Sequence, residues 1–312
     1  MRIVLVGGSG FLGHYLVRAF QAAGHQSVVL TRQAVRHRDV QLLRGVKLVQ
    51  ADVHDPDALR LQFTGADAVI SMAGILNQGM GGSGFQRVHV ELVEKIVDAC
   101  QATGTRRLLH ISALNAGKGE SQYLESKGQA EQVVNAARDL DSTIFQPSVI
   151  FGPGDSFFNR FAGLLRFIPV MPLACGDSKL QPVYSVDVAN AVSSSLNDPG
   201  TFGRSFELGG PSVYRLVELV RFTAATLGLK RLVIPQPDAL SIVQGAVMGI
   251  LPNSPFSLDN YHSLKTDNVC ERNGFEYFRI SPSSIEARVP DYLVSSVRQR
   301  RLTDMRRRAR RG

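Results

Sequence analysis

The sequence predicts an α/β protein: a doubly wound parallel sheet, followed by a smaller and irregular C-terminal region. Apolar, strand-like runs alternate with helix-like stretches through the first half of the chain. A glycine-rich turn directly follows the first of these runs, and the alternation ends near Pro147. Strand–helix–strand alternation implies parallel strands joined by right-handed crossovers.

Six strands are expected in the first half of the chain. The first, Arg2–Gly7, is the uninterrupted apolar run that a parallel strand buried on both faces requires. The other five are Ser27–Thr31, Val46–Ala51, Ala66–Ser71, Arg107–Ile111 and Ser142–Gln146. Stretches with helical periodicity separate them, and the expected helices are Phe11–Ala23, Pro56–Phe63, Phe85–Thr103 and Tyr123–Leu140.

The pattern becomes less regular after Pro147, with longer loops and shorter strands. Short strands are expected over Gln181–Ser185 and Ser205–Leu208, and prolines interrupt the stretch Pro169–Pro172. The expected helices are Phe157–Phe167, Asp187–Leu196, Val213–Leu227, Asp238–Gly249 and Ser283–Val297. Such a half is typical of a substrate region laid over the edge of a sheet.

The first strand leads into Gly7-Gly8-Ser9-Gly10-Phe11-Leu12-Gly13, a GxxGxxG arrangement that also opens a helix. Gly7 and Gly10 permit a tight turn whose backbone N–H groups can approach a pyrophosphate, and Gly13 allows close packing of the helix. The positive end of the helix then stabilises the phosphate charge. This motif predicts a Rossmann fold that binds a dinucleotide through Gly7, Gly10, Phe11, Leu12 and Gly13.

Residues after the next strands indicate which dinucleotide is bound. The second strand ends at Thr31-Arg32, where an acidic residue would bind a ribose 2′-hydroxyl. The planar guanidinium of Arg32 suits a 2′-phosphate instead, so NADP(H) is preferred. NAD(H) stays possible, because Arg32 could simply stack on adenine. We expect further cofactor contacts from residues that follow the third and fourth strands: Asp52, Val53, Ala73 and Gly74.

A YxxxK motif, Tyr123-Leu124-Glu125-Ser126-Lys127, accompanies the glycine signature and Asp52-Val53. Together they resemble the extended short-chain dehydrogenase/reductase superfamily, of the NAD-dependent epimerase/dehydratase type. The runs PSVIFGPGDSFFNRF, PVYSVDVANAV and LKTDNV are similar to one atypical branch. That branch contains the Rossmann-type accessory subunit of mitochondrial complex I and its bacterial relatives. The resemblance also implies cofactor contacts at Pro147 and Val149.

The resemblance implies a catalytic set of Tyr123, Lys127 and Ser112. Tyr123 and Lys127 are four residues apart and share a helix face. We expect the ammonium to lower the tyrosine pKa and to hold the nicotinamide ribose, while Ser112 polarises a carbonyl. Ser112 is one alternative; the other is that Ala113 occupies the working position. His89 stands where an asparagine is usual, so the set is incomplete.

Two functions of different class follow from these residues. The first is an NAD(P)-dependent oxidoreductase or epimerase that transfers hydride on an apolar, quinone- or isoprenoid-related carbonyl or alcohol. Its pocket would include phenylalanines that otherwise belong to the core: Phe157, Phe158, Phe161 and Phe167. The alternative is a non-catalytic, cofactor-stabilised accessory or assembly protein of a membrane respiratory complex. An apolar stretch including Leu240, Val243, Val247, Met248 and Ile250 would then face a membrane or pack on the Rossmann half.

Three parts of the chain are expected: an NAD(P)-binding domain over 1–150, a substrate or partner region over 151–297, and an arginine-rich tail over 298–312. Elements of the second part are expected to return to the Rossmann sheet. The tail carries eight arginines and one aspartate, and the whole chain has a formal charge of +8. The rest of the chain is therefore close to neutral, which argues against nucleic-acid binding. The tail is either a solvated end or a contact with an anionic membrane or partner.

The cysteines and the first residues of the chain indicate the cellular compartment of the protein. Cys100, Cys175 and Cys270 are far apart and form no CxxC pair, which indicates a reducing compartment and no metal site. The first strand begins at Arg2, leaving no room for a signal peptide. We expect a cytoplasmic protein, at most peripheral to a membrane, and the sequence leaves the oligomeric state open.

Overall fold

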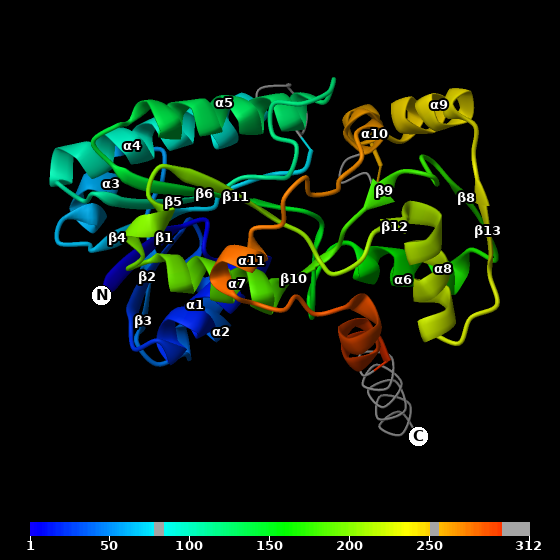
Figure 1. Ribbon diagram of the computed structural model, residues 1–312, viewed down its shortest axis with the longest axis horizontal. Coiled ribbons are helices and arrows are strands. Elements are labelled where there is room, and N and C mark those ends of the chain that lie inside the picture. The colour runs from blue at the N-terminus through cyan, green and yellow to red at the C-terminus, as the bar shows by residue number, and fades with distance from the viewer. Residues whose placement is uncertain (78–83, 250–255, 295–312) are drawn as a thin grey trace.

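The computed structural model describes residues 1–77, 84–249 and 256–294 of the chain. Within that part, helices flank a seven-stranded sheet, and a smaller lobe lies at one end of it (Figure 1). The strand order is β11-β6-β5-β4-β1-β2-β3, and every pairing is parallel. The predicted doubly wound parallel sheet is confirmed.

Six of the seven strands come from the first half and lie within two residues of the predicted bounds. They are β1 (Arg2–Val6), β2 (Gln26–Thr31), β3 (Val46–Gln50), β4 (Ala68–Ser71), β5 (Arg107–Ile111) and β6 (Asp141–Pro147). The seventh, β11 (Arg204–Leu208), follows from the second half and pairs with β6. The second half therefore returns to the Rossmann sheet and completes one edge of it.

Helices cover both faces of the sheet (Figure 1). One face carries α1 (Phe11–Ala22) and α7 (Ser185–Ser195), and the other carries α3 (Pro56–Phe63), α4 (Leu92–Thr103) and α5 (Gln122–Ala136). Ile3 and Leu5 of β1 belong to the core under α1, whereas Val4 and Val6 belong to the core under α4. This two-sided burial explains why β1 is an uninterrupted apolar run. The short η1 (Ala34–His37) and α2 (Arg38–Gln41) connect β2 to β3.

The smaller lobe has its own apolar core. It is built from α6 (Phe158–Phe167), β8 (Val170–Leu173), α8 (Leu216–Thr226), β13 (Leu232–Pro235), α9 (Asp238–Gly249) and α10 (Leu258–Lys265). Short strands join this lobe to the sheet, pairing β7 (Ile150–Phe151) with β10 (Val183–Tyr184) and β9 (Lys179–Leu180) with β12 (Tyr214–Arg215). The chain then passes through α11 (Phe275–Phe278) to a helix over 285–294.

Prolines account for two errors of the sequence interpretation. The single strand predicted over Gln181–Ser185 is wrong, because the chain forms β9 before Pro182 and β10 after it. The stretch Pro169–Pro172 contains most of β8, which pairs with β13 in a separate two-stranded ribbon. Proline is tolerated there because such a ribbon has open edges that need no N–H donor.

Two of the expected features lie partly or wholly outside the described residues. The arginine-rich tail, 298–312, lies outside the described residues. So do the side chains of Val243, Val247 and Met248, together with Ile250, although α9 itself forms as predicted. Within the residues that are described, no helix is long and apolar enough to cross a membrane.

Candidate functional site

The predicted site residues gather at one edge of the sheet. Because β1, β4, β5 and β6 are parallel and in register, their carboxyl ends meet at that edge. The glycine turn follows β1, Ala73 and Gly74 follow β4, Ser112 follows β5, and Pro147 ends β6. In open α/β sheets this is the edge where ligands bind.

Steric constraints explain two glycines of the turn. Gly7 has φ of +90°, and a Cβ on it would lie 2.6 Å from the backbone nitrogen of Ala73. A Cβ on Gly13 would lie 2.0 Å from the carbonyl oxygen of Gly8. No side chain fits at either position, so the turn packs directly against the segment after β4 and against its own helix.

The start of α1 fits the pyrophosphate of a dinucleotide. Its N-cap residue, Gly10, offers no side-chain acceptor to the first N–H groups, and the first turn contains no acidic residue. A Cβ on Gly10 would meet only the carbonyl oxygen of Gly7, at 3.5 Å, so internal packing does not require a glycine there. Uncapped N–H groups facing an open position are what a phosphate needs. Phe11 and Leu12 form the first turn beside them.

The neighbouring strands bring the expected adenosine contacts to the same edge. Arg32 is exposed directly after β2, and no carboxylate of the described residues forms an ion pair with it. The Asp52 carboxylate follows β3 and accepts a hydrogen bond from the N–H of His54 at 2.9 Å. Val53 packs on the apolar core beneath. The guanidinium of Arg32 is thus available to an anion beside the glycine turn.

Helix α5 carries the YxxxK motif, and the C-terminal lobe holds its first turn. The Ser121 hydroxyl accepts a hydrogen bond from the N–H of Leu124 at 3.3 Å. The carboxylate of Asp259, on α10, accepts hydrogen bonds from the N–H groups of Gln122 at 2.7 Å and Tyr123 at 3.3 Å. A carboxylate at a helix N-terminus is electrostatically favourable. Tyr123 is therefore held in place by a residue that sequence reasoning missed.

Lys127 lies one turn further along α5 and points to the end of β5. Its Nζ is buried and donates a hydrogen bond to the carbonyl oxygen of Ile111 at 3.1 Å. A Cβ on Gly74 would come within 3.7 Å of this nitrogen. Burial lowers the pKa of Lys127 to about 8, which the nearby Glu131 carboxylate partly counteracts. A glycine at position 74 therefore keeps Lys127 within reach of a ligand at the edge.

The expectation that Lys127 lowers the pKa of Tyr123 is wrong. Burial, with a smaller contribution from the Asp259 carboxylate, raises the pKa of Tyr123 to about 12. The phenol ring packs against the rings of Phe85 and His89, at centroid distances of 5.9 and 5.6 Å. The lysine ammonium points instead to the Ile111 carbonyl. Tyr123 is consequently protonated at neutral pH and can serve as a proton donor.

His89 connects the segment after β4 to α5 through a directed chain of hydrogen bonds. The N–H of Ile75 donates to His89 Nε2 at 3.0 Å, so the ring proton resides on Nδ1. Nδ1 contacts the Ser126 hydroxyl at 2.8 Å, which donates to the carbonyl oxygen of Tyr123 at 2.8 Å. Burial, aided by the charge of Lys127, lowers the pKa of His89 to about 3. The imidazole is therefore neutral.

The backbone around His89 also departs from the predicted single helix over Phe85–Thr103. Residues Gln86–Glu91 form a π-helical turn, η2, before α4 begins at Leu92. Such turns are rare and frequently occur at functional sites. Here the turn places a buried histidine against the ring of Tyr123.

Ser112 directly follows β5 and is buried, and its hydroxyl forms no hydrogen bond with any of the described residues. Ala113, the other alternative for the working position, is buried next to it in the chain. Which of the two residues occupies the working position stays a prediction.

The four phenylalanines proposed for an apolar pocket do not lie in one common environment. Phe158 is fully buried in the core of the smaller lobe, and Phe157 and Phe161 pack on that core. Phe167 is 85% exposed on the outside of the lobe. Core packing, the other interpretation of these aromatics, therefore holds for the first three.

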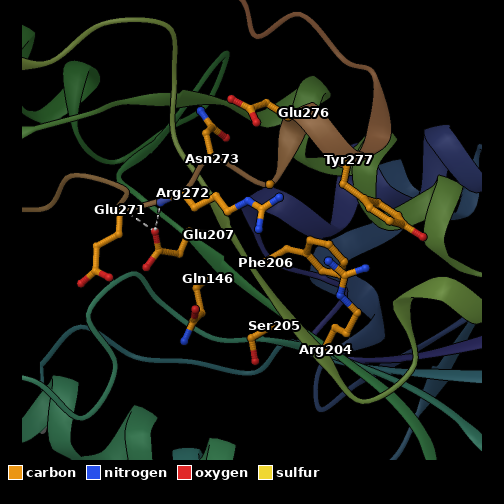
Figure 2. Close-up of a pocket in the computed structure, with 11 residues that line it drawn as sticks. Gln146, Arg204, Ser205, Phe206, Glu207, Glu271, Arg272, Asn273, Glu276 and Tyr277 are labelled. Atoms are coloured by element: carbon orange, nitrogen blue, oxygen red, sulfur yellow. Dashed lines mark hydrogen bonds between the residues drawn. The ribbon is translucent and has the colours of Figure 1, made fainter.

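A cleft of about 450 Å³ lies elsewhere, along β11 and the segment 271–277 (Figure 2). Arg204, Glu207 and Arg272 extend into it, and Gly274 donates a backbone hydrogen bond to the Glu207 carbonyl. None of the predicted site residues lines this cleft. Gln146 at its margin connects it to α5 by donating hydrogen bonds to the Glu131 carboxylate at 2.9 Å.

The neutral state of His89 predicts a pH dependence of folding stability. The unfolded chain takes up a proton near the ordinary histidine pKa of 6.5, whereas the folded chain does so near 3. The stability that His89 contributes is therefore complete above pH 6.5 and is lost as the pH falls toward 3. Between pH 7 and pH 5, the variant His89→Asn should lose about 2 kcal/mol less unfolding free energy than the parent.

Urea unfolding at the two pH values measures this difference. His37→Asn, in η1 away from the site, is the matched control and should behave as the parent does. Identical pH dependence in His89→Asn and the parent would show that folding does not lower the pKa of His89.

Comparisons with known proteins agree with this geometry. Residues 7–155 match the family described as NAD(P)H-binding. The chain is 29% identical over 293 residues to NADH dehydrogenase (ubiquinone) 1 alpha subcomplex subunit 9 of Mus musculus mitochondria, covering 90% of this chain and 76% of that protein. It is also 29% identical over 259 residues to the ceramide reductase of Caulobacter vibrioides, covering 81% and 80% of the two chains.

The fold is shared with solved enzymes. The NADPH-dependent quinone oxidoreductase of Escherichia coli superposes with a TM-score of 0.73 at 17% identity, covering 96% of this chain and 99% of that one. The resemblance inferred from the glycine turn and the YxxxK motif is confirmed. Residues 7–155 thus form an NAD(P)H-binding domain, and most of the chain is similar to the complex I subunit and to the ceramide reductase.

Proposed function

We propose that this protein is an NADP(H)-dependent reductase that acts on a carbonyl carbon of an apolar substrate, of quinone- or isoprenoid-related type. One observation carries the proposal. Tyr123 and the buried Lys127 lie one turn apart on α5, and Lys127 is within reach of Gly74 at the edge that holds the glycine turn. Proton donor, ribose-binding ammonium and pyrophosphate-binding turn are thereby assembled on one edge.

Lys127 and Tyr123 have different roles in the proposed reaction. A bound nicotinamide would supply the hydride. Lys127, with a pKa near 8, retains enough charge at neutral pH to hold ribose hydroxyls. Tyr123, with a pKa near 12, stays protonated and can donate its proton to the oxygen that becomes an alkoxide. A protonated phenol favours reduction of a carbonyl over oxidation of an alcohol.

The proposed preference for NADP(H) rests on Arg32. It is exposed at the end of β2, next to the glycine turn, and a guanidinium there can hold two oxygens of a 2′-phosphate. The apolar substrate class is supported by the names of two similar proteins, a ceramide reductase and a quinone oxidoreductase.

A second function is favoured by one specific observation. The Ser112 hydroxyl is buried and forms no hydrogen bond with any of the described residues, so none of them orients it toward a substrate carbonyl. The complex I subunit to which 90% of the chain is similar is an assembled component, as its name states. A non-catalytic, cofactor-stabilised accessory protein of a membrane respiratory complex, located in the cytoplasm or at the membrane surface, is therefore the alternative.

The variant Tyr123→Phe tests the reductase. It should leave NADPH affinity unchanged and abolish NADPH oxidation by quinones and apolar ketones, because the only change is loss of the proton donor. Absorbance of NADPH measures turnover, and calorimetry measures binding. Tyr277→Phe, a surface tyrosine, is the matched control and should retain full activity. Turnover retained in Tyr123→Phe would remove this residue from the mechanism, and tight binding without turnover in the parent would favour the accessory protein.

The variant Arg32→Asp tests the cofactor preference. It should weaken NADPH binding by about 1–3 kcal/mol, the cost of a lost charged hydrogen bond, and leave NADH binding nearly unchanged. Calorimetric titration with both cofactors measures the difference. Arg44→Asp makes the same charge change just before β3, at the opposite edge of the sheet, and should affect neither cofactor. An equal loss for NADPH and NADH in Arg32→Asp would argue against a 2′-phosphate contact.

A further inference from the structure

The smaller lobe presents an apolar ribbon on its outer side, at the end of the molecule far from the Rossmann helices (Figure 1). Strands β8 and β13 pair in parallel, with Val170 opposite Leu232 and Pro172 opposite Ile234. Met171 and Val233 point inward and are buried, whereas Val170, Leu232 and Ile234 are 50%, 58% and 45% exposed. We define the apolar ribbon as these outward residues together with Phe167, which precedes β8: Phe167, Val170, Pro172, Leu232 and Ile234.

Basic residues are frequent around the apolar ribbon. The segments that contain its strands, 156–176 and 219–237, include five basic residues, and the acidic residues Asp155, Asp177, Glu218 and Asp238 flank them directly. The guanidinium of Arg231 donates hydrogen bonds to the carbonyl oxygens of Leu165 and Arg166, and that of Arg221 donates to Val233. These contacts hold two of the positive charges against the strands, and Lys230 is exposed beside them.

The exposed apolar character continues into the next helix. α9 begins three residues after β13, and its Leu240 and Ile242 are 57% and 43% exposed. The acidic residue at its start, Asp238, pairs with Lys265 at 2.7 Å. The carboxylate at the start of α9 is therefore balanced by a lysine.

We propose that the apolar ribbon docks on the surface of an anionic lipid bilayer. Exposed apolar side chains gathered in one place mark an interaction surface. A surface that combines them with Arg and Lys fits the boundary between acyl chains and anionic headgroups. The contact is interfacial, with Phe167 and the β8–β13 side chains inserted below the basic residues. This inference does not depend on the proposed reductase activity.

Vesicle co-sedimentation of the full chain tests the proposal. The parent should bind vesicles of phosphatidylcholine with phosphatidylglycerol, and bind phosphatidylcholine alone far less. The triple variant Phe167→Ser, Leu232→Ser, Ile234→Ser should lower the partition coefficient by about 100-fold, because three inserting side chains are lost. The replaced side chains are largely exposed, and thermal unfolding checks that the variant is folded. NADPH binding should stay unchanged, because the proposed cofactor site is on the Rossmann sheet and not on the smaller lobe's outer side.

The controls separate this surface from other causes of binding. Leu42→Ser, Leu61→Ser removes comparably exposed leucines from the Rossmann half and should bind vesicles as the parent does. The arginine-rich tail is present in every variant, so full vesicle binding by the triple variant would overturn the proposal. A parent that forms dimers which the triple variant does not form, with no vesicle binding by either, would also overturn it and identify a second copy of the chain as the partner.

Discussion

The hydrogen bond from the buried ammonium of Lys127 to the carbonyl oxygen of Ile111 is the contact around which the candidate site is arranged. It joins the end of β5 to the middle of α5, and therefore fixes how the YxxxK helix lies over the sheet. A buried ammonium needs an acceptor to offset its lost hydration, and a strand terminus supplies an unpaired carbonyl. Gly74 lies beside the same nitrogen, which a Cβ at that position would contact at 3.7 Å.

Two neutral imidazoles lie near that charge, in addition to the Glu131 carboxylate. His89 and His110 both approach Lys127, and burial together with this positive neighbour keeps the pKa values of both imidazoles low. Uncharged imidazoles avoid repulsion with the ammonium, and His89 can still accept and donate hydrogen bonds. The polar residues between β4 and α5 thus form a pre-arranged set in which one group carries the charge.

Much of the Rossmann half was predictable because its signals are local. The helix Pro56–Phe63 was placed without error, since Asp55 caps it and Pro56 occupies its first turn. The glycine turn was equally predictable, because the steric constraints that require glycine involve residues close to it in the chain. The properties that sequence reasoning missed depend on distant partners. The raised pKa of Tyr123 involves Asp259, which lies far along the chain. Strand β8 pairs with β13, some sixty residues later, and both strands contain a proline, which is unfavourable in a strand pattern.

The cap that Asp259 provides on α5 has a consequence for biosynthesis. A ribosome releases the Rossmann strands and the YxxxK helix long before α10, so the emerging chain has the first-turn N–H groups of Gln122 and Tyr123 without their carboxylate. The candidate site is therefore finished among the last steps of folding, when the C-terminal lobe arrives. A truncated translation product that ends before α10 would contain the glycine turn and the YxxxK motif and still lack the carboxylate that anchors the tyrosine.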